Sequence, residues 1–221
     1  MIRKLLKKLT HPFLKYGTQK YFSKARKYKY EGIEVMVMPG VFPPHYTLST
    51  KILLDYLKQL DLKNKTVLEL GCGSGIISLF AASKEAIVTA SDINTVALEA
   101  LDEASEKNRL QLEIINSDFF NNIANQSFDY VMINPPYYPK KPKNIKEQAW
   151  FCGEDFEYFK TLFKQLSQRQ DKTVLMILSQ DCDIDTIKNI ASKHQFQLEI
   201  EYEHSTLGER NFIFRLVATR S

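Results

Sequence analysis

Residues 66–75 of the 221-residue chain read Thr-Val-Leu-Glu-Leu-Gly-Cys-Gly-Ser-Gly, a short apolar segment that runs directly into three alternating glycines. The pattern of residues 66–70 is typical of a buried strand, and a helical pattern begins after Gly75. Glycine tolerates a left-handed backbone and leaves no side chain between the main chain and a ligand. The segment therefore predicts a sharp strand-to-helix turn that approaches a bound molecule closely.

The rest of the chain repeats this alternation of strand and helix. Further short strands are predicted at residues 33–38, 87–91, 112–116, 128–133 and 173–179. Amphipathic helices are predicted at residues 48–60, 75–83, 95–108, 155–168 and 183–194. Only a turn at Leu207-Gly208 separates the last two strands, 197–203 and 211–218, so they are predicted to pair antiparallel. This order is typical of an α/β fold, a mostly parallel sheet with helices on both faces.

Positive charge is concentrated at the start of the chain. The net charge is +4, but residues 1–30 hold ten Lys or Arg and no Asp or Glu. Apolar residues from Ile2 to Phe13 recur at helical spacing opposite the lysines, which predicts a basic helical arm over residues 1–31 before a single domain at 32–221. Such an arm suits a polyanion, either nucleic acid or an anionic membrane surface, or serves only as a solubilising segment.

Several classes of protein are not expected. The apolar runs are too short for a transmembrane helix, and lysines interrupt any secretory signal near the start. Cys72, Cys152 and Cys182 form no CxxC pair and the histidines show no metal-ligand spacing, so neither a disulfide framework nor a metal site is predicted. The expected setting is reducing and cytoplasmic, without an integral membrane segment. The sequence leaves the oligomeric state open.

The glycines Gly71, Gly73 and Gly75 depart from the dinucleotide fingerprint G-x-G-x-x-G, because the third glycine comes one residue early. Ile76 occupies the place where that fingerprint has glycine. This departure disfavours a pyrophosphate and favours a ligand with an amino acid group, whose ammonium could face Glu69. The three glycines and Glu69 are therefore candidate cofactor contacts.

Acidic residues also end the next two predicted strands. Asp92, followed by Ile93, can accept hydrogen bonds from both hydroxyls of a ribose. Asp118 can accept from an adenine amine while the ring of Phe119 stacks on the base. Because the carboxyl ends of parallel strands share one edge, Glu69, Asp92 and Asp118 are predicted to meet there. Each residue alone also fits a plainer role in helix capping or packing.

The tetrad Asn134-Pro135-Pro136-Tyr137 directly follows the predicted strand at 128–133. Its two prolines stiffen the turn and remove two backbone donors. The Asn134 side-chain carbonyl and the Pro135 backbone carbonyl can each accept an N–H from a planar NH₂ group and aim its lone pair at a methyl donor. Tyr137 can stack on the flat face of that group, so the tetrad predicts catalysis by positioning. The candidate acceptor contacts around it are Pro136, Tyr138, Lys140 and Lys141.

The segments Leu68–Gly75 and Asn134–Tyr137, with Asp92 and Asp118, resemble the motif series of class I S-adenosylmethionine-dependent amino-methyltransferases of the NPPY type. Over residues 32–219 the chain is similar to the HemK-like glutamine methyltransferases and to the small methyltransferase domains that modify ribosomal or transfer RNA. The resemblance implies a Rossmann-like, seven-stranded sheet whose last strand is antiparallel. It also implies S-adenosylmethionine as cofactor, S-adenosylhomocysteine as product, and contact between the cofactor and Asn134.

Two further segments resemble the HemK-like enzymes more loosely. Residues 40–44, followed by Thr47, Ser49 and Thr50, resemble the segment that closes over the cofactor, although the Arg-Pro-Glu-Thr pattern of bacterial release-factor methyltransferases is absent. Residues 152–155 resemble the glycine-rich stretch after the tetrad.

The tetrad alone does not separate the possible acceptors. The basic arm and the lysines after the tetrad favour an exocyclic base amine in RNA, less so in DNA, because phosphate neutralisation gives affinity. These lysines are Lys140, Lys141, Lys143 and Lys146. A protein glutamine presents the same planar NH₂ and is the alternative. A non-enzyme alternative is a cofactor-binding protein that binds nucleic acid or a membrane surface, against which the intact Asn134 argues.

Overall fold

The computed structural model describes residues 23–45, 47–206 and 208–219. The strands of its main sheet are β3 (Thr66–Leu70), β4 (Ile87–Asp92), β5 (Glu113–Asn116), β6 (Tyr130–Ile133), β7 (Thr173–Ser179), β8 (Phe196–Thr206) and β9 (Glu209–Ala218). The helices are α2 (Leu48–Leu57), α3 (Ile76–Ser83), α4 (Thr95–Asn108), α5 (Ile145–Gln148), α6 (Glu157–Leu166) and α7 (Ile184–Lys193). A separate hairpin consists of β1 (Arg26–Tyr30) and β2 (Ile33–Val37).

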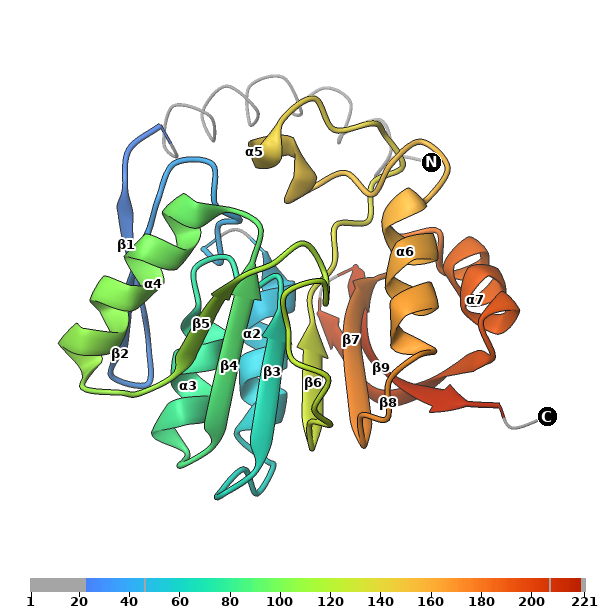
Figure 1. Cartoon of the computed structure of the whole chain (residues 1–221). Helices are drawn as coiled ribbons and strands as arrows, with labels where there is room; N and C mark the ends of the chain where they lie inside the picture. Colours follow the sequence, from blue (N-terminus) through green and yellow to red (C-terminus); the bar gives the residue numbers. More distant parts are fainter. Residues whose placement is uncertain (1–22, 46, 207, 220–221) are drawn as a thin grey trace.

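Within the described residues, the main sheet has seven strands in the order β5-β4-β3-β6-β7-β9-β8. The pairs among β5, β4, β3, β6 and β7 are parallel, and β9 pairs antiparallel with both β7 and β8. The predicted mostly parallel sheet with an antiparallel last strand is thus confirmed. Figure 1 shows the parallel strands ending at one edge, with the segment that carries α5 crossing above it.

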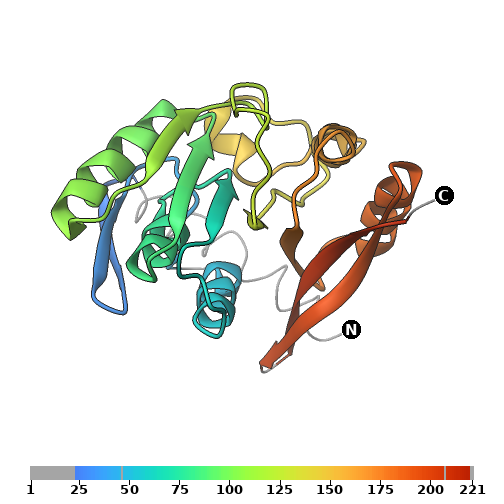
Figure 2. The same ribbon diagram turned by 60° about the horizontal axis from the view of Figure 1, so that its bottom comes forward.

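Helices cover both faces of the sheet because successive strand residues point to opposite sides. Val67 joins the hydrophobic cluster that packs under α2, α3 and α4, whereas its neighbour Leu68 joins the cluster under α6 and α7. Figure 2 shows α2 and α3 on one side of the sheet. It also shows α7 beside the long β8–β9 hairpin, which closes the other end of the molecule.

The β1–β2 hairpin packs beside α3 and α4, so the chain contributes structure before residue 32. The ring of Tyr30 meets Phe80 of α3 edge to face at 5.2 Å. At the end of α4, the Asn108 side chain donates to the Glu34 carbonyl at 2.8 Å and accepts from its N–H at 3.1 Å. The predicted helical arm at 1–31 is wrong for Arg26–Tyr30, because this segment pairs as a strand with β2. The arm's residues 1–22 lie outside the described residues, and the boundary at residue 32 stays a prediction.

Two other boundaries differ from the sequence prediction for local reasons. Strand β6 starts at Tyr130 rather than residue 128, because the N–H of Phe128 donates to the Asp171 side chain and that of Asp129 to the Thr66 hydroxyl. Helix α6 starts at Glu157, since Phe156 has a left-handed backbone with φ of 57°. No helix of the described residues is long and apolar enough to cross a membrane.

Candidate active site

A pocket of about 630 Å³ lies at the edge where β3, β4 and β6 end. Its other wall is the segment from residue 138 to 153 that carries α5, hereafter the roof (Figure 1). The predicted site residues that line this pocket are Glu69, Gly71, Gly73, Asp92, Ile93, Asp118, Phe119, Asn134, Pro136 and Lys141. The strand ends and the tetrad therefore meet in one cavity.

The glycine-rich turn is fixed to the end of β4 by its own backbone. The N–H groups of Gly71 and Cys72 donate to the Ser91 carbonyl at 2.8 and 2.9 Å. The N–H of Gly73 donates to the Asp92 carboxylate at 2.8 Å. Gly71 has φ of 74°, and a Cβ built on it would meet nothing within 4 Å. The turn thus presents bare backbone to the pocket, as predicted from glycine's lack of a side chain.

Gly75 is not among the residues that line the pocket, and its assignment as a cofactor contact stays a prediction. It precedes α3 with φ of 70°, and a Cβ there would lie 2.2 Å from the Cδ1 atom of Leu101 on α4. Glycine is required here because the helices pack closely and the backbone is left-handed.

The Glu69 carboxyl is buried at the end of β3 and lines the pocket. Both the N–H, at 2.8 Å, and the hydroxyl of Ser78 donate to its Oε2 atom. Burial raises the pKa of Glu69 to about 8, against the two bonds from Ser78 that lower it. No Lys, Arg or His of the described part of the chain forms an ion pair with it. A cation entering the pocket would therefore meet a carboxyl that has no ion-pair partner among the described residues, and it would favour the ionised form of that carboxyl.

Asp92 ends β4 and is partly buried beside the glycine-rich turn. Its two carboxylate oxygens accept the N–H groups of Gly73 and Asn94, each at 2.8 Å. Burial raises the pKa of Asp92, and these backbone bonds oppose the rise. The carboxylate therefore both holds the turn and faces the pocket, where each oxygen keeps a lone pair for a further donor.

Asp118 and Phe119 follow β5 and lie together on the pocket wall. Phe119 has a left-handed backbone with φ of 50°, an uncommon conformation for a bulky residue. Its ring contacts Tyr158 of α6 at 4.9 Å between centroids. Sequence reasoning missed Tyr158, which also lines the pocket and whose pKa is raised by burial. The two rings form an aromatic wall beside the Asp118 carboxylate.

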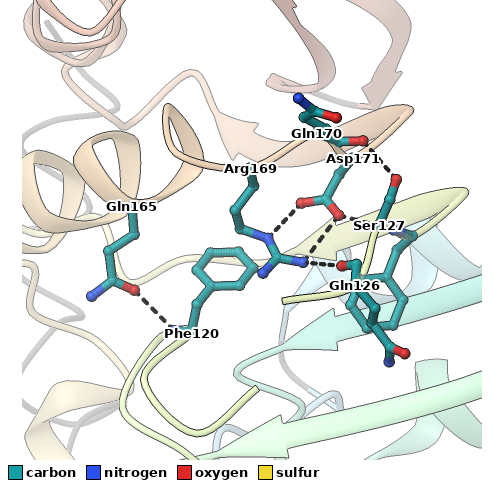
Figure 3. A network of polar contacts seen from close by, with 8 residues as sticks. Phe120, Gln126, Ser127, Gln165, Arg169, Gln170 and Asp171 are labelled. Carbon is teal, nitrogen blue, oxygen red and sulfur yellow. Dashed lines mark hydrogen bonds and ion pairs between the residues drawn. The ribbon is translucent and has the colours of Figure 1, made fainter. Parts of the chain in front are cut away.

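A polar network holds the loop that continues from Phe119 (Figure 3). The Gln165 side chain accepts the N–H of Phe120 at 3.0 Å. The Arg169 guanidinium lies over the Phe120 ring at 4.5 Å and donates to both oxygens of Asp171 and to the Gln126 carbonyl. Because the Arg169 and Asp171 side chains are only 7% and 1% exposed, this is a buried bidentate ion pair. The loop bearing Asp118 and Phe119 thus has a rigid support.

Asn134 begins the tetrad at the end of β6 and lines the pocket. Its side-chain NH₂ is 3.5 Å from the hydroxyl oxygen of Thr50, a buried residue of α2, 84 positions earlier in the chain. This contact directs the amide nitrogen to Thr50 and leaves the side-chain carbonyl as an acceptor. Gly40, Val41 and Phe42 line the pocket with Thr50, so the loosely matched segment near residue 40 does reach the site.

Four other predicted residues do not line the pocket: Pro135, Tyr137, Tyr138 and Lys140. Tyr137 packs against the hydrophobic cluster under α6 and α7, with its ring 4.8 Å from Tyr138. The Lys140 ammonium lies over the Phe151 ring at 4.6 Å. In this structure the two side chains therefore lie against aromatic partners, and Phe151, the partner of Lys140, itself lines the pocket. The stacking of Tyr137 and the acceptor contact of Lys140 stay predictions.

The roof is a closed loop that sequence reasoning did not predict. Its two ends pair at Tyr138 and Phe151. The N–H of Tyr138 donates to the Trp150 carbonyl at 3.1 Å, and the N–H of Cys152 donates to the Tyr138 carbonyl at 3.0 Å. The Trp150 ring contacts Phe42 at 4.9 Å, which joins the roof to the segment near residue 40. Short helix α5 has no apolar periodicity of its own, so only the tertiary contact identifies it. The sequence match at residues 152–155 did locate a pocket segment, since Cys152, Gly153 and Glu154 line the cavity.

The three cysteines are free and buried. Burial raises the pKa of Cys152 to about 11 and of Cys182 to about 12, and raises that of Cys72 as well. A thiol with a raised pKa is a poor nucleophile at neutral pH. Within the described residues, no cluster of three or more His, Cys, Asp or Glu could hold a metal ion.

A comparison with known protein families gives a match that covers most of the residues of this site. The model of the family described as the methyltransferase small domain matches residues 32–151, more than half of the chain. The chain belongs to this family. The match runs from the residue before β2 to Phe151 of the roof, so the small methyltransferase domain includes the glycine-rich turn, both strand-end aspartates and the tetrad.

Relatives of this small methyltransferase domain include proteins of two kinds. A Methanocaldococcus jannaschii protein, provisionally assigned as a protein N5-glutamine methyltransferase, is 40% identical over 111 residues, which are 49% of this chain and 53% of that protein. The ribosomal RNA small subunit methyltransferase C of Buchnera aphidicola is 34% identical over 120 residues, 53% of this chain and 36% of that protein. The chain thus spans about half or less of the length of these relatives.

Solved structures of low sequence identity share the fold. The 16S rRNA N2 G1207 methyltransferase of T. thermophilus, in complex with AdoMet and guanosine, has a TM-score of 0.64 and 16% identity, covering 89% of this chain and 50% of that one. The E. cuniculi Mtq2–Trm112 complex, responsible for methylation of the eRF1 termination factor, has a TM-score of 0.60 and 21% identity, covering 80% and 98%.

Proposed function

We propose that the chain is an S-adenosylmethionine-dependent N-methyltransferase whose acceptor is a planar amino group, an exocyclic base amine in RNA. One observation carries this proposal: Asn134 lines the same pocket as Glu69 and Asp92, two carboxyls that form no ion pair within the described residues. The family match and the presence of both RNA and protein methyltransferases among the relatives support it.

The side of the pocket that would hold the methyl donor, hereafter the donor side, fits S-adenosylmethionine in charge and shape. The buried Glu69 carboxyl suits its ammonium, and the Asp92 carboxylate suits the two ribose hydroxyls. Asp118 with Phe119 suits the adenine amine and ring, and Tyr158 adds a second aromatic surface beside Phe119. Bare backbone at Gly71 leaves room for the methionine part of the molecule.

The side of the pocket around Asn134 that would hold the amino group, hereafter the acceptor side, suits catalysis by positioning. The bound cofactor supplies an electrophilic methyl group on a sulfonium. The nitrogen lone pair of an amide or aromatic amine is delocalised, so rate depends on holding it in line with that methyl group. The Asn134 carbonyl, left free because its NH₂ points to Thr50, can accept one N–H and fix the orientation.

The roof favours a flat base over a glutamine side chain as acceptor. Its pocket-lining residues include Pro142, Ile145 and Phe151, which give apolar walls, and Gln148, which can form hydrogen bonds. Apolar walls with a few polar groups are typical of sites that take an unstacked base. Lys141 at the same wall adds a positive charge suited to a nearby phosphate.

Labelled methyl transfer in cell extract tests the proposal. The full chain is incubated with methyl-labelled S-adenosylmethionine, and RNA and protein products are then separated. We expect the label in RNA, as N-methylated base. Label in protein glutamine alone would establish the alternative acceptor, and no transfer to either, together with no cofactor binding in calorimetry, would refute the proposal.

A further inference from the structure

A second hollow, hereafter the α6–α7 groove, lies between the exposed sides of these two helices and measures about 640 Å³. Its lining offers hydrogen-bond donors from both helices and their ends: Lys160, Thr161, Lys164, Gln165, Lys193 and His194. Among the described residues that line it there is no Asp or Glu. A hollow lined by cations and neutral donors suits a polyanion.

Two of the groove lysines differ from the third in that they form no ion pair within the described residues. Lys160 forms an ion pair with Asp155, so its charge is largely balanced. In the described part of the chain, Lys164 and Lys193 form no ion pair.

The groove continues from the active-site pocket along α6. Thr161 lines both hollows, and Asp155 directly follows Glu154 of the pocket wall. A ligand that filled the pocket and extended along α6 would therefore reach Lys164 and Lys193.

We infer that the α6–α7 groove binds the phosphodiester backbone of the RNA acceptor while one of its bases occupies the pocket. This inference rests on the proposed function and assigns it a docking surface. Lys164 and Lys193 contact phosphates, giving sequence-independent affinity that weakens with salt. Gln165 lines the groove and also holds the loop after Phe119, so it is left unchanged in the test.

The test compares two double variants of the full chain. Lys164→Gln with Lys193→Gln removes the charges of these two groove lysines and keeps similar side-chain length. Lys63→Gln with Lys84→Gln removes two lysine charges from exposed positions before β3 and β4, outside the groove, where Lys63 pairs with Glu85. Affinity for a fluorescent single-stranded RNA of mixed sequence is measured over a salt series, and S-adenosylmethionine binding is measured by calorimetry.

We expect the groove variant to bind this RNA roughly tenfold more weakly, with the slope of log affinity against log salt reduced by about 1.4. The control variant should keep the wild-type affinity and slope, and all three proteins should bind the cofactor equally. The inference would be overturned by an unchanged RNA affinity in the groove variant, or by an equal loss of RNA affinity in the control variant. In either case, methylation of RNA by the wild-type protein would still support the proposed function. Wild-type methylation of protein but not RNA would overturn both.

Discussion

Acidic residues at the two edges of the sheet have opposite surroundings. At the carboxyl edge, Glu69 and Asp92 form no ion pair among the described residues, and burial raises the pKa of each. At the amino edge, Asp129 pairs with Lys172 at 2.7 Å and Asp171 with Arg169 at 2.7 Å. The Lys172 bond and those from Thr66 hold the pKa of Asp129 well below its usual range.

This difference in ion pairing indicates that the two edges of the sheet have different roles, one in ligand binding and the other in stability. Paired carboxylates at the amino edge stabilise the fold, whereas the unpaired carboxyls at the carboxyl edge cost stability and suit a cationic ligand. Substitutions at the carboxyl edge should therefore change binding or transfer, and those at the amino edge should change the free energy of unfolding.

The largest expected effect is at Asn134. Asn134→Ala removes the positioned carbonyl, so methyl transfer should fall at least ~100-fold. Cofactor affinity, measured by calorimetry, and the free energy of unfolding should stay close to wild type. As a matched control, Thr50→Val removes only the contact that orients the amide and should lower the transfer rate less. Wild-type activity in Asn134→Ala would refute the assigned role.

The next effect is on stability, at the buried pair of the amino edge. Asp171→Ala leaves the Arg169 guanidinium buried without its counter-charge, with the Gln126 carbonyl as a neutral acceptor, which should cost roughly 3 kcal/mol in urea unfolding. Replacing both residues, by Arg169→Met and Asp171→Leu, should cost less, because no unpaired charge remains. If the single variant kept its stability but lost transfer at saturating cofactor, the proposed division between the edges would be wrong.

Glu69 should make cofactor affinity depend on pH. Its pKa of about 8 means that the carboxyl is largely protonated at pH 6. Binding of an ammonium favours the carboxylate, so affinity should rise from pH 6 to 8 by up to about 50-fold and then level off. In Glu69→Gln this rise should disappear. Ser78→Ala removes a donor that lowers the pKa, so its plateau should begin at higher pH; identical profiles for wild type and Glu69→Gln would contradict the assignment.

In the protein without cofactor, Glu69 should make the free energy of unfolding fall as pH rises, which is opposite to its effect on cofactor affinity. The folded pKa of Glu69 lies above the unfolded value of 4.5, so the folded state binds the proton more tightly. Its contribution to stability is therefore full below pH 4.5 and lost as pH rises through 8. Urea unfolding across this window should show a fall that Glu69→Gln lacks.

The smallest effect is expected at Asp129, where stability should depend on pH in the direction opposite to that at Glu69. Because its folded pKa is lowered, its stabilisation is present above the ordinary value of 3.8 and lost as pH falls through the folded value. Asp129→Asn should be slightly less stable than wild type at pH 7, and the two should converge in acid. A difference that persisted unchanged at pH 2 would show that the charge is not responsible.

Much of the fold and of the donor side could be predicted from sequence, because both depend on local order. Alternating strands and helices specify a parallel sheet, and parallel strands bring Glu69, Asp92 and Asp118 to one edge whatever the rest of the chain does. Asn134 followed from the same rule, since the tetrad directly follows a strand.

The acceptor side could not be predicted as well, because it depends on contacts between distant segments. The contact of Phe42 with Trp150, and of Thr50 with Asn134, has no signal in either local sequence. After the prolines, the direction of Tyr137 is decided by the cluster under α6 and α7, which sequence order does not reveal. The packing of Gly75 against Leu101 was not predicted either, because Leu101 belongs to another helix.

The contact between Phe42 and Trp150 also equips the protein with an intrinsic optical probe. Trp150 is the single tryptophan of the sequence, and it lies where the roof meets the segment near residue 40. Its emission should change when a ligand moves the roof against that segment, without a label and without a background from other indoles. Stopped-flow fluorescence can thus follow movement of the roof in the native chain.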